Sequence, residues 1–245
     1  MTTIIKQIGL ETKLFLRGRQ NLFLTLAFPA IMILIFGSVF SKETWSGVPA
    51  INYLLPGIIV MAAMMACMNN NLIKVTNERE KGIYRRLSLT PLNRQTILVG
   101  DVVVRYLIVL ASTALLILLG VNIFKAQFGG NFFLFWLVLT VGALVFVSIG
   151  FVLTSLVKNT NSAMSLGMAV LFPMMFLGGC FWPADTMPSF LQSISQALPT
   201  THLNIALRMI VVQSAGFGQV WHELPVMLGW LVGCSVLAVR LFKWE

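Results

Sequence analysis

The densest group of charged side chains lies in residues 74–91, with the sequence KVTNEREKGIYRRLSLTP. Acidic and basic residues alternate there, a pattern suited to ion pairs and to binding a charged surface. Asn77 followed by Glu80 is typical of a helix start, with an Asn cap and a carboxylate facing the positive helix end. Pro91 ends such a helix. The pattern predicts a short charged helix over residues 77–90.

Composition alone fits two interpretations of this segment equally: a solvated loop bound to anionic lipid, or a helix that docks to a protein. Ile83, Tyr84 and Leu87 give an apolar stripe. Binding to lipid alone needs no Glu78 or Glu80, so the mixed signs favour a protein partner. The candidate docking residues are Asn77, Glu78, Arg79, Glu80, Lys81, Gly82, Tyr84, Arg85, Arg86 and Leu87.

A second charged pair, Asp101 and Arg105, is spaced i,i+4 and can pair on one helix face. A boundary ion pair is the commoner explanation, and a gating role is the alternative. The apolar segments carry almost no other ionisable side chains, which argues against a proton-coupled carrier and an intramembrane protease.

The sequence lacks the residues that ATP binding and metal binding require. The sequence has no G-x-x-x-x-G-K-[ST] loop, so we expect no ATP site and no resident cofactor in this chain. No His, Cys and Glu set has metal-ligand spacing, so we expect no metal. His202 and His222 are interpreted as interfacial residues, and the three cysteines as small apolar ones.

The elements that position these residues follow from composition. The chain has 245 residues, of which 58% are hydrophobic and 10% charged, with a mean hydropathy of +0.88. Soluble domains have about 25% charged residues. The composition excludes a soluble enzyme, a secreted disulfide module and a nucleic-acid binder, and we expect no nucleic-acid partner despite the net charge of +9.

Long uncharged runs predict membrane spans, since a bilayer core needs about 20 apolar residues in a helix. The runs are continuously apolar rather than alternating, which favours helices over a barrel. The predicted fold class is an all-α integral membrane protein, built as a single domain over residues 1–245. The six predicted spans are residues 22–41, 52–73, 98–121, 133–156, 163–181 and 223–241.

Basic residues set the expected orientation. With the N-terminus in the cytoplasm, 14 of the 17 Lys and Arg residues lie on that side. Residues 1–20 predict a basic amphipathic helix on the membrane surface rather than a signal peptide. We therefore expect a multi-pass protein of the plasma (inner) membrane with both termini in the cytoplasm.

Residues 182–222 form the longest external segment. Pro183, Pro188 and Pro199 each interrupt a helix there, yet the residues between them are too apolar for an exposed loop. Two short helices re-entering the membrane over residues 184–212 would shield this backbone. The alternative is an interfacial loop with aromatic anchors.

These two segments resemble one known family. Asn77-Glu78-Arg79-Glu80-Lys81-Gly82, followed by Arg86-Leu87 and Thr90-Pro91, resembles the "ER-E-G…L…TP" segment of type-2 ATP-binding cassette exporter permeases. The run from Gly178 to Arg208 resembles that family's "GG-F-P…MP…P-T…R" region. Ile83 stands where many members carry Thr. The resemblance covers nearly the whole chain and is to the drug-efflux-like branch of that family.

The resemblance implies specific partners and roles. Residues 77–90 would be a coupling helix between spans two and three that contacts a separate ATPase subunit, present in two copies that bind ATP and Mg. A second permease copy would complete a homodimer, or a heterodimer, surrounded by membrane lipid. The re-entrant helices would form an outer gate that includes Gly178, Gly179, Phe181, Pro183, Pro188 and Pro199.

The cargo is predicted from weaker features. Met61, Met64, Met65 and Met68 share one helix face and could line a path for hydrophobic molecules, although helix packing is the commoner reason for such a stripe. The uncharged spans favour an amphipathic or hydrophobic, drug-like or lipid-like substrate. Export of a glycan or peptide remains an alternative, as do a non-transporting scaffold that docks an ATPase, and a channel or secondary carrier.

Overall fold

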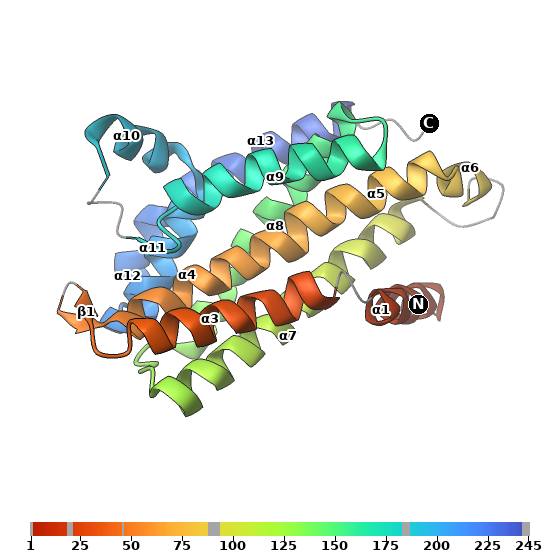
Figure 1. Ribbon diagram of the computed structural model, residues 1–245. Coiled ribbons are helices and arrows are strands. Elements are labelled where there is room, and N and C mark those ends of the chain that lie inside the picture. Colours follow the sequence, from red (N-terminus) through yellow and green to blue (C-terminus); the bar gives the residue numbers. More distant parts are fainter. Residues whose placement is uncertain (1, 19–21, 46, 88–93, 183–186, 242–245) are drawn as a thin grey trace.

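The computed structural model describes residues 2–18, 22–45, 47–87, 94–182 and 187–241 as a bundle of helices (Figure 1). The first half comprises α1 (Thr2–Arg17), the π-helical turn η1 (Phe23–Ala27), α3 (Phe28–Val39), the paired strands β1 (Thr44–Trp45) and β2 (Val48–Pro49), α4 (Ala50–Met64), the π-helical turn η2 (Met65–Asn69), α5 (Asn70–Glu80), α6 (Ile83–Leu87) and α7 (Arg94–Phe124). The second half comprises α8 (Phe132–Leu156), α9 (Thr160–Leu177), α10 (Ser189–Ala197), α11 (Pro199–Gln213), α12 (Phe217–Val220), the 3-10 turn η4 (Trp221–Glu223) and α13 (Leu224–Leu241).

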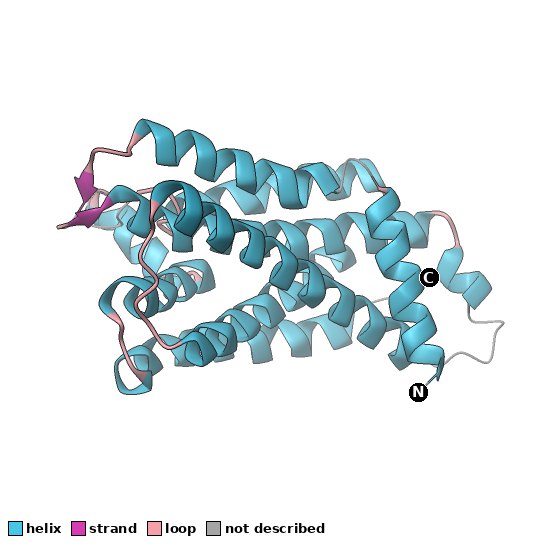
Figure 2. Cartoon of the chain, turned by 90° about the horizontal axis from the view of Figure 1, so that it is seen from below, coloured by secondary structure: helices cyan, strands magenta, loops and turns pink. Residues whose placement is uncertain are grey.

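The bundle has two distinct ends. The strands lie at one end, which we call the β1 end, and most helices run away from it (Figure 2). α1, α6 and the last turn of α13 lie at the other, the α6 end (Figure 1). The charged residues identified in the sequence therefore gather at the α6 end.

One long helix forms the centre of the bundle. α4, η2 and α5 are continuous from Ala50 to Glu80, and almost all of their apolar part is buried. α3, α7, α8 and α11 pack on α4, while α8 and α9 pack on α5. A helix that is apolar on every side can be buried on every side, and in this fold Ala50–Glu80 takes that place.

The spans largely follow the predicted boundaries. Within the described residues, five helical segments are long and apolar enough to cross a membrane: Ala50–Glu80, Val99–Phe124, Phe132–Leu156, Thr160–Leu177 and Phe217–Leu241. The segment expected as the first span, 22–41, instead forms a shorter apolar helix, Phe23–Val39. Pro29 cannot donate a backbone hydrogen bond to the preceding turn, which is wound as the π-helical turn η1.

The predicted start of the charged helix at Asn77 is wrong. α5 continues through Asn77 to Glu80, and the carbonyl of Asn77 accepts the backbone N–H of Lys81 at 3.0 Å. The helix ends because Gly82 adopts a left-handed φ of 66°, which glycine accepts without steric cost. Of the predicted range 77–90, α5 supplies 77–80 and α6 supplies 83–87, while 88–90 lie outside the described residues.

At the β1 end, prolines start two helices as expected. Pro188 precedes α10, and Pro199 occupies the first turn of α11, where its missing N–H has no partner to lose. α11 is mostly buried against α4 and α8. Pro183 lies outside the described residues, as do 184–186 of the predicted segment 184–212.

Close packing at Gly57 generates a prediction. A Cβ at Gly57 would lie 1.9 Å from the carbonyl oxygen of Cys180, so Gly57→Ala must displace backbone. We expect this variant to lower the unfolding temperature in detergent by several degrees. Gly229→Ala, which meets nothing within 4 Å, is the matched control and should be neutral or stabilising, because Ala favours a helix by about 1 kcal/mol. Equal unfolding temperatures for the two variants would contradict the packing.

Candidate functional site

A cluster of ionised side chains joins three helices at the α6 end. The ammonium of Lys74 on α5 lies 2.5 Å from Glu11 Oε2 on α1 and 2.6 Å from Asp101 Oδ1 on α7. Glu78, one turn further along α5, lies 3.6 Å from Lys74, and Arg105 lies 3.6 Å from Asp101. We call Glu11, Lys74, Glu78, Asp101 and Arg105 the buried ion cluster.

These contacts matter energetically because the side chains are buried. Glu11, Asp101 and Arg105 are each at most 8% exposed. A charge removed from water costs several kcal/mol unless partners replace its hydration, so the members of such a cluster depend on one another. Three carboxylates face two cations, and Lys74 is the cation that contacts all three.

The structure brings together Asp101 and Arg105, as their spacing predicts, and adds partners that local spacing could not find. Glu11 and Lys74 are 63 positions apart. One signal was present in the sequence: Glu11 is the only acidic residue in the first 42. A single carboxylate in a basic amphipathic helix has a reason to face a cation elsewhere in the fold.

Tyr84 attaches α6 to the cluster. Its hydroxyl donates to Glu78 Oε2 at 2.9 Å, and its ring is buried. Burial, followed by the negative charges of Glu78 and Asp101, raises the pKa of Tyr84 above its usual value. Tyr84 therefore stays a neutral hydrogen-bond donor, and through Glu78 it attaches α6 to the ion cluster that also holds α1 and α7.

The next two residues of α5 hold two other helices. Arg79 Nη2 donates to the carbonyl of Thr154 at 3.1 Å and to that of Val157, at the C-terminal end of α8. Glu80 Oε2 accepts from the backbone N–H and the hydroxyl of Thr160, at 2.8 and 2.6 Å, at the start of α9. A cation at a helix C-terminus and an anion at an N-terminus both complement the helix dipole.

Three of the other predicted docking residues are basic and lie on the surface. Lys81, Arg85 and Arg86 are exposed, and Arg86 donates to the carbonyl of Lys81 at 3.0 Å. The side chain of Leu87 lies outside the described residues. The corner between α5 and α6, residues 77–87, therefore binds the bundle through Glu78, Arg79, Glu80 and Tyr84 and presents a basic surface.

At the β1 end, one arginine missing from the predicted gate set connects its members. The guanidinium of Arg208 on α11 lies 3.5 Å from the centre of the Tyr53 ring and donates to the Tyr53 hydroxyl at 2.7 Å. Its Nη2 donates to the carbonyl of Gly179 at 2.5 Å. Asn204 donates to the carbonyl of Gly178 at 3.0 Å. The two glycines after α9 are thus held by α11.

The other predicted gate residues that the structure describes lie in the same region. Phe181 is buried, with its ring centre 5.3 Å from that of Phe36 on α3. Pro188 and Pro199 start α10 and α11. An arginine within an apolar stretch, as at Arg208, is the sequence signal that could have placed this residue in the set.

His202 also has defined partners. Its Nδ1 lies 2.5 Å from Glu223 Oε2 on η4, and its Nε2 lies 2.8 Å from the carbonyl of Gln196 on α10. The hydrogen bond with Glu223 is the largest of the effects that raise the pKa of His202. The imidazole is thus a link between three elements, and no group of three potential metal ligands occurs among the described residues.

The methionine stripe lies inside the subunit. Met61, Met64 and Met68 are fully buried, and Met65 is 5% exposed. They belong to the central helix, whose neighbours are other helices of the same chain. In this structure their side chains fill the core, as in the packing interpretation, rather than lining an open path.

Five of the described helical segments are long and apolar enough to cross a membrane, and they pack around a buried central helix with ion pairs at one end. This architecture is that of an integral membrane protein. Residues 8–212 match the ABC-2 type transporter family. Since the match covers most of the sequence, the chain belongs to this family as a permease domain.

Several relatives carry names of transporters. The chain is 28% identical to the daunorubicin resistance ABC transporter permease protein DrrB1 of Streptomyces coeruleorubidus, over 89% of this chain and 76% of that protein. It is 24% identical to the probable multidrug ABC transporter permease YbhR of Escherichia coli, over 78% of this chain and 52% of the relative. It is 25% identical to ABC transporter G family member 20 of Dictyostelium discoideum, over 77% and 26%. The chain thus spans about half or less of the length of the last two.

The ion cluster generates a prediction. Lys74→Met leaves three carboxylates near one remaining cation, and we expect it to cost about 3 kcal/mol of stability, as for breaking a buried ion pair. Lys74→Met/Glu11→Gln removes one of the unbalanced charges and should recover part of the loss, while Asp101 keeps Arg105 as its partner. The measurement is the unfolding temperature in detergent. The exposed Lys42, changed to Met, is the control, and a loss equal to that control would contradict the cluster's role.

His202 generates a pH prediction. Its pKa is raised in the folded protein, so its contribution is fully present below about pH 6.5, the usual histidine value, and is lost as pH rises through the folded pKa. We expect the unfolding temperature to fall more between pH 6 and pH 9 in the native chain than in His202→Gln. His222→Gln, at an exposed neighbour, should keep the native slope. Parallel pH profiles for native protein and His202→Gln would exclude the link.

Proposed function

We propose that this chain is the membrane subunit of an ATP-driven exporter, with the corner between α5 and α6 docking a separate ATPase. Two copies of the chain would pair, as a homodimer, with two ATPase subunits that bind ATP and Mg. The apolar helix Phe23–Val39 would be the first of six spans. The protein would lie in the plasma (inner) membrane, with both termini in the cytoplasm. Membership of the ABC-2 type transporter family supports this assembly.

The observation that carries the proposal is the division of roles at the corner. Glu78, Arg79 and Glu80 are consecutive, and each holds a different neighbour: the buried ion cluster, α8 and α9. Arg85 and Arg86 are exposed beside them. A partner that moves the exposed face would move α1, α7, α8 and α9 through these contacts, so docking and transmission would reside in one short segment.

At the opposite end we propose the exit gate. Gly178, Gly179 and Phe181 follow α9, and α10 and α11 start at Pro188 and Pro199. Arg208 holds the Gly179 carbonyl to Tyr53 on the central helix, so release of that contact would free the α9–α10 connection. α10 and α11 would be the short re-entrant helices.

For the cargo we propose an amphipathic or hydrophobic, drug-like or lipid-like molecule. The names of two relatives, for daunorubicin resistance and for probable multidrug transport, support this class. We assign the buried methionines to packing. A path between two copies would use side chains that one copy leaves exposed, such as Phe172 and Phe176 on α9. Export of a glycan or peptide by the same machinery is the alternative cargo.

The corner generates the main functional prediction. Arg85→Glu/Arg86→Glu reverses two exposed charges and should weaken binding of the partner ATPase by more than about tenfold, with the permease still folded. Glu80→Ala removes the acceptor of both Thr160 hydrogen bonds and so releases α9, and it should leave ATPase binding intact while reducing coupled transport. Co-purification and transport-linked ATP hydrolysis in liposomes measure the two effects separately.

The control is Lys42→Glu, an exposed charge at the β1 end, which should behave as native in both assays. If the double arginine variant bound the ATPase and transported as the native protein does, the docking role would be wrong. A membrane scaffold that docks an ATPase without transport is the second candidate, because it would use the same surface. Substrate-stimulated ATP hydrolysis separates them, since a scaffold has no reason to show it.

A further inference from the structure

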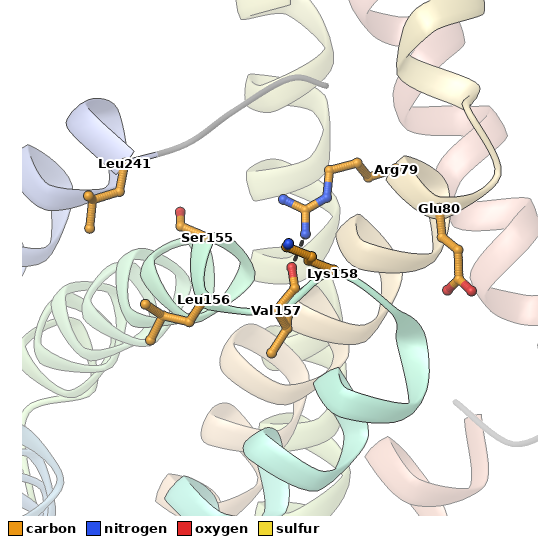
Figure 3. Close-up of a pocket in the computed structure, with 7 residues that line it drawn as sticks. All are labelled: Arg79, Glu80, Ser155, Leu156, Val157, Lys158 and Leu241. Carbon is orange, nitrogen blue, oxygen red and sulfur yellow. Dashed lines mark hydrogen bonds between the residues drawn. The ribbon is translucent and has the colours of Figure 1, made fainter.

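A surface cavity at the α6 end borders the docking corner and shares Arg79 and Glu80 with it. Its volume is about 480 Å³, within the range of ligand-binding pockets. Arg79 and Glu80 line it from α5, Ser155 and Leu156 from α8, Lys158 from the connection to α9, and Leu241 from the last turn of α13 (Figure 3). Three chain segments that are distant in the sequence therefore meet around it.

The polar part of the cavity is positive. Arg79 and Lys158 both line the cavity, whereas the Glu80 carboxylate points away from it in Figure 3 and accepts the hydrogen bonds of Thr160. Both hydrogen bonds of Arg79 to α8 use Nη2, so they do not consume the other donors of the guanidinium. Lys158 is exposed. A fork of donors beside an ammonium suits a phosphate group.

The other part of the cavity is apolar and continues a lipid-facing surface. Leu156 is 63% exposed and Leu241 is 45% exposed. α13 packs on α8 through Met227 and Cys234, while Val239, two residues before Leu241, is 84% exposed. In a membrane protein such a face contacts hydrocarbon, so the cavity lies where the lipid-facing surface meets the first cations.

We propose that this cavity binds the phosphate headgroup of an anionic phospholipid, with the acyl chains along Leu156 and the outer face of α13. Lipid is favoured over a protein ligand because the apolar wall is continuous with the exposed side of α13. The leaflet concerned, the inner one, follows from the orientation proposed above. The binding itself does not depend on ATPase docking or on transport.

The test uses the purified permease in detergent, without an ATPase, and counts retained lipid by native mass spectrometry. Phosphatidylglycerol should bind more tightly than phosphatidylcholine. Lys158→Gln should weaken phosphatidylglycerol about fivefold, the effect of about 1 kcal/mol for one basic residue at a lipid surface. Ser155→Trp, which fills the cavity without changing charge, should weaken it further. Lys42→Gln, an exposed lysine at the β1 end, should have no effect.

Four results would overturn the proposal. Equal retention of the two lipids would remove the anionic selectivity, and equal behaviour of Lys158→Gln and Lys42→Gln would remove the site. Full competition by inorganic phosphate, together with unchanged retention in Ser155→Trp, would assign the cations to a free anion. A parallel ATPase-binding assay covers the protein alternative: if Lys158→Gln loses the ATPase but keeps phosphatidylglycerol, the cavity belongs to the docking surface and the lipid proposal is wrong.

Discussion

The charge of Lys74 is the constraint on which the α6 end depends. The ammonium is largely removed from water and is held within 2.5–3.6 Å of carboxylates on α1, α5 and α7. A buried ion is tolerated only while its partners are in place. α1 also packs on α7, with Phe15 buried in the core. Through Glu11 it is attached to the central helix, and through Asp101 the third predicted span is attached as well.

Helix geometry explains how one segment reaches so many neighbours. Successive residues of an α-helix point about 100° apart, so Glu78, Arg79 and Glu80 leave α5 in three directions. Each direction meets a different neighbour. The contacts of Arg79 with the end of α8 and of Glu80 with the start of α9 have the sign that those helix ends favour. A rigid central helix with such an end transmits a displacement better than a flexible loop would. This geometry supports the proposed coupling role independently of any sequence motif.

Much of the fold could be predicted from where charges are missing, because the bilayer imposes a length that composition alone satisfies. The predicted spans 133–156 and 223–241 match α8 and α13 to within one residue. The start of the charged helix was missed, since an Asn–Glu spacing occurs inside helices as well as at their starts. Contacts such as Glu11–Lys74 and Tyr53–Arg208 join elements distant in sequence, and helical periodicity carries information only about neighbours on one helix.

The two ends of the bundle are held by different interactions, and this bears on how it could move. The α6 end is joined by the buried ion cluster. Removing one member leaves the charges of the others uncompensated, so the helices that carry them should shift together. The β1 end is joined by separate contacts of an arginine with Tyr53 and Gly179 and of a histidine with Glu223, each of which can break alone. Under the proposed function, force applied at the corner would therefore travel along the central helix as a rigid-body motion. It would be released where contacts are independent, which is the end assigned to the gate.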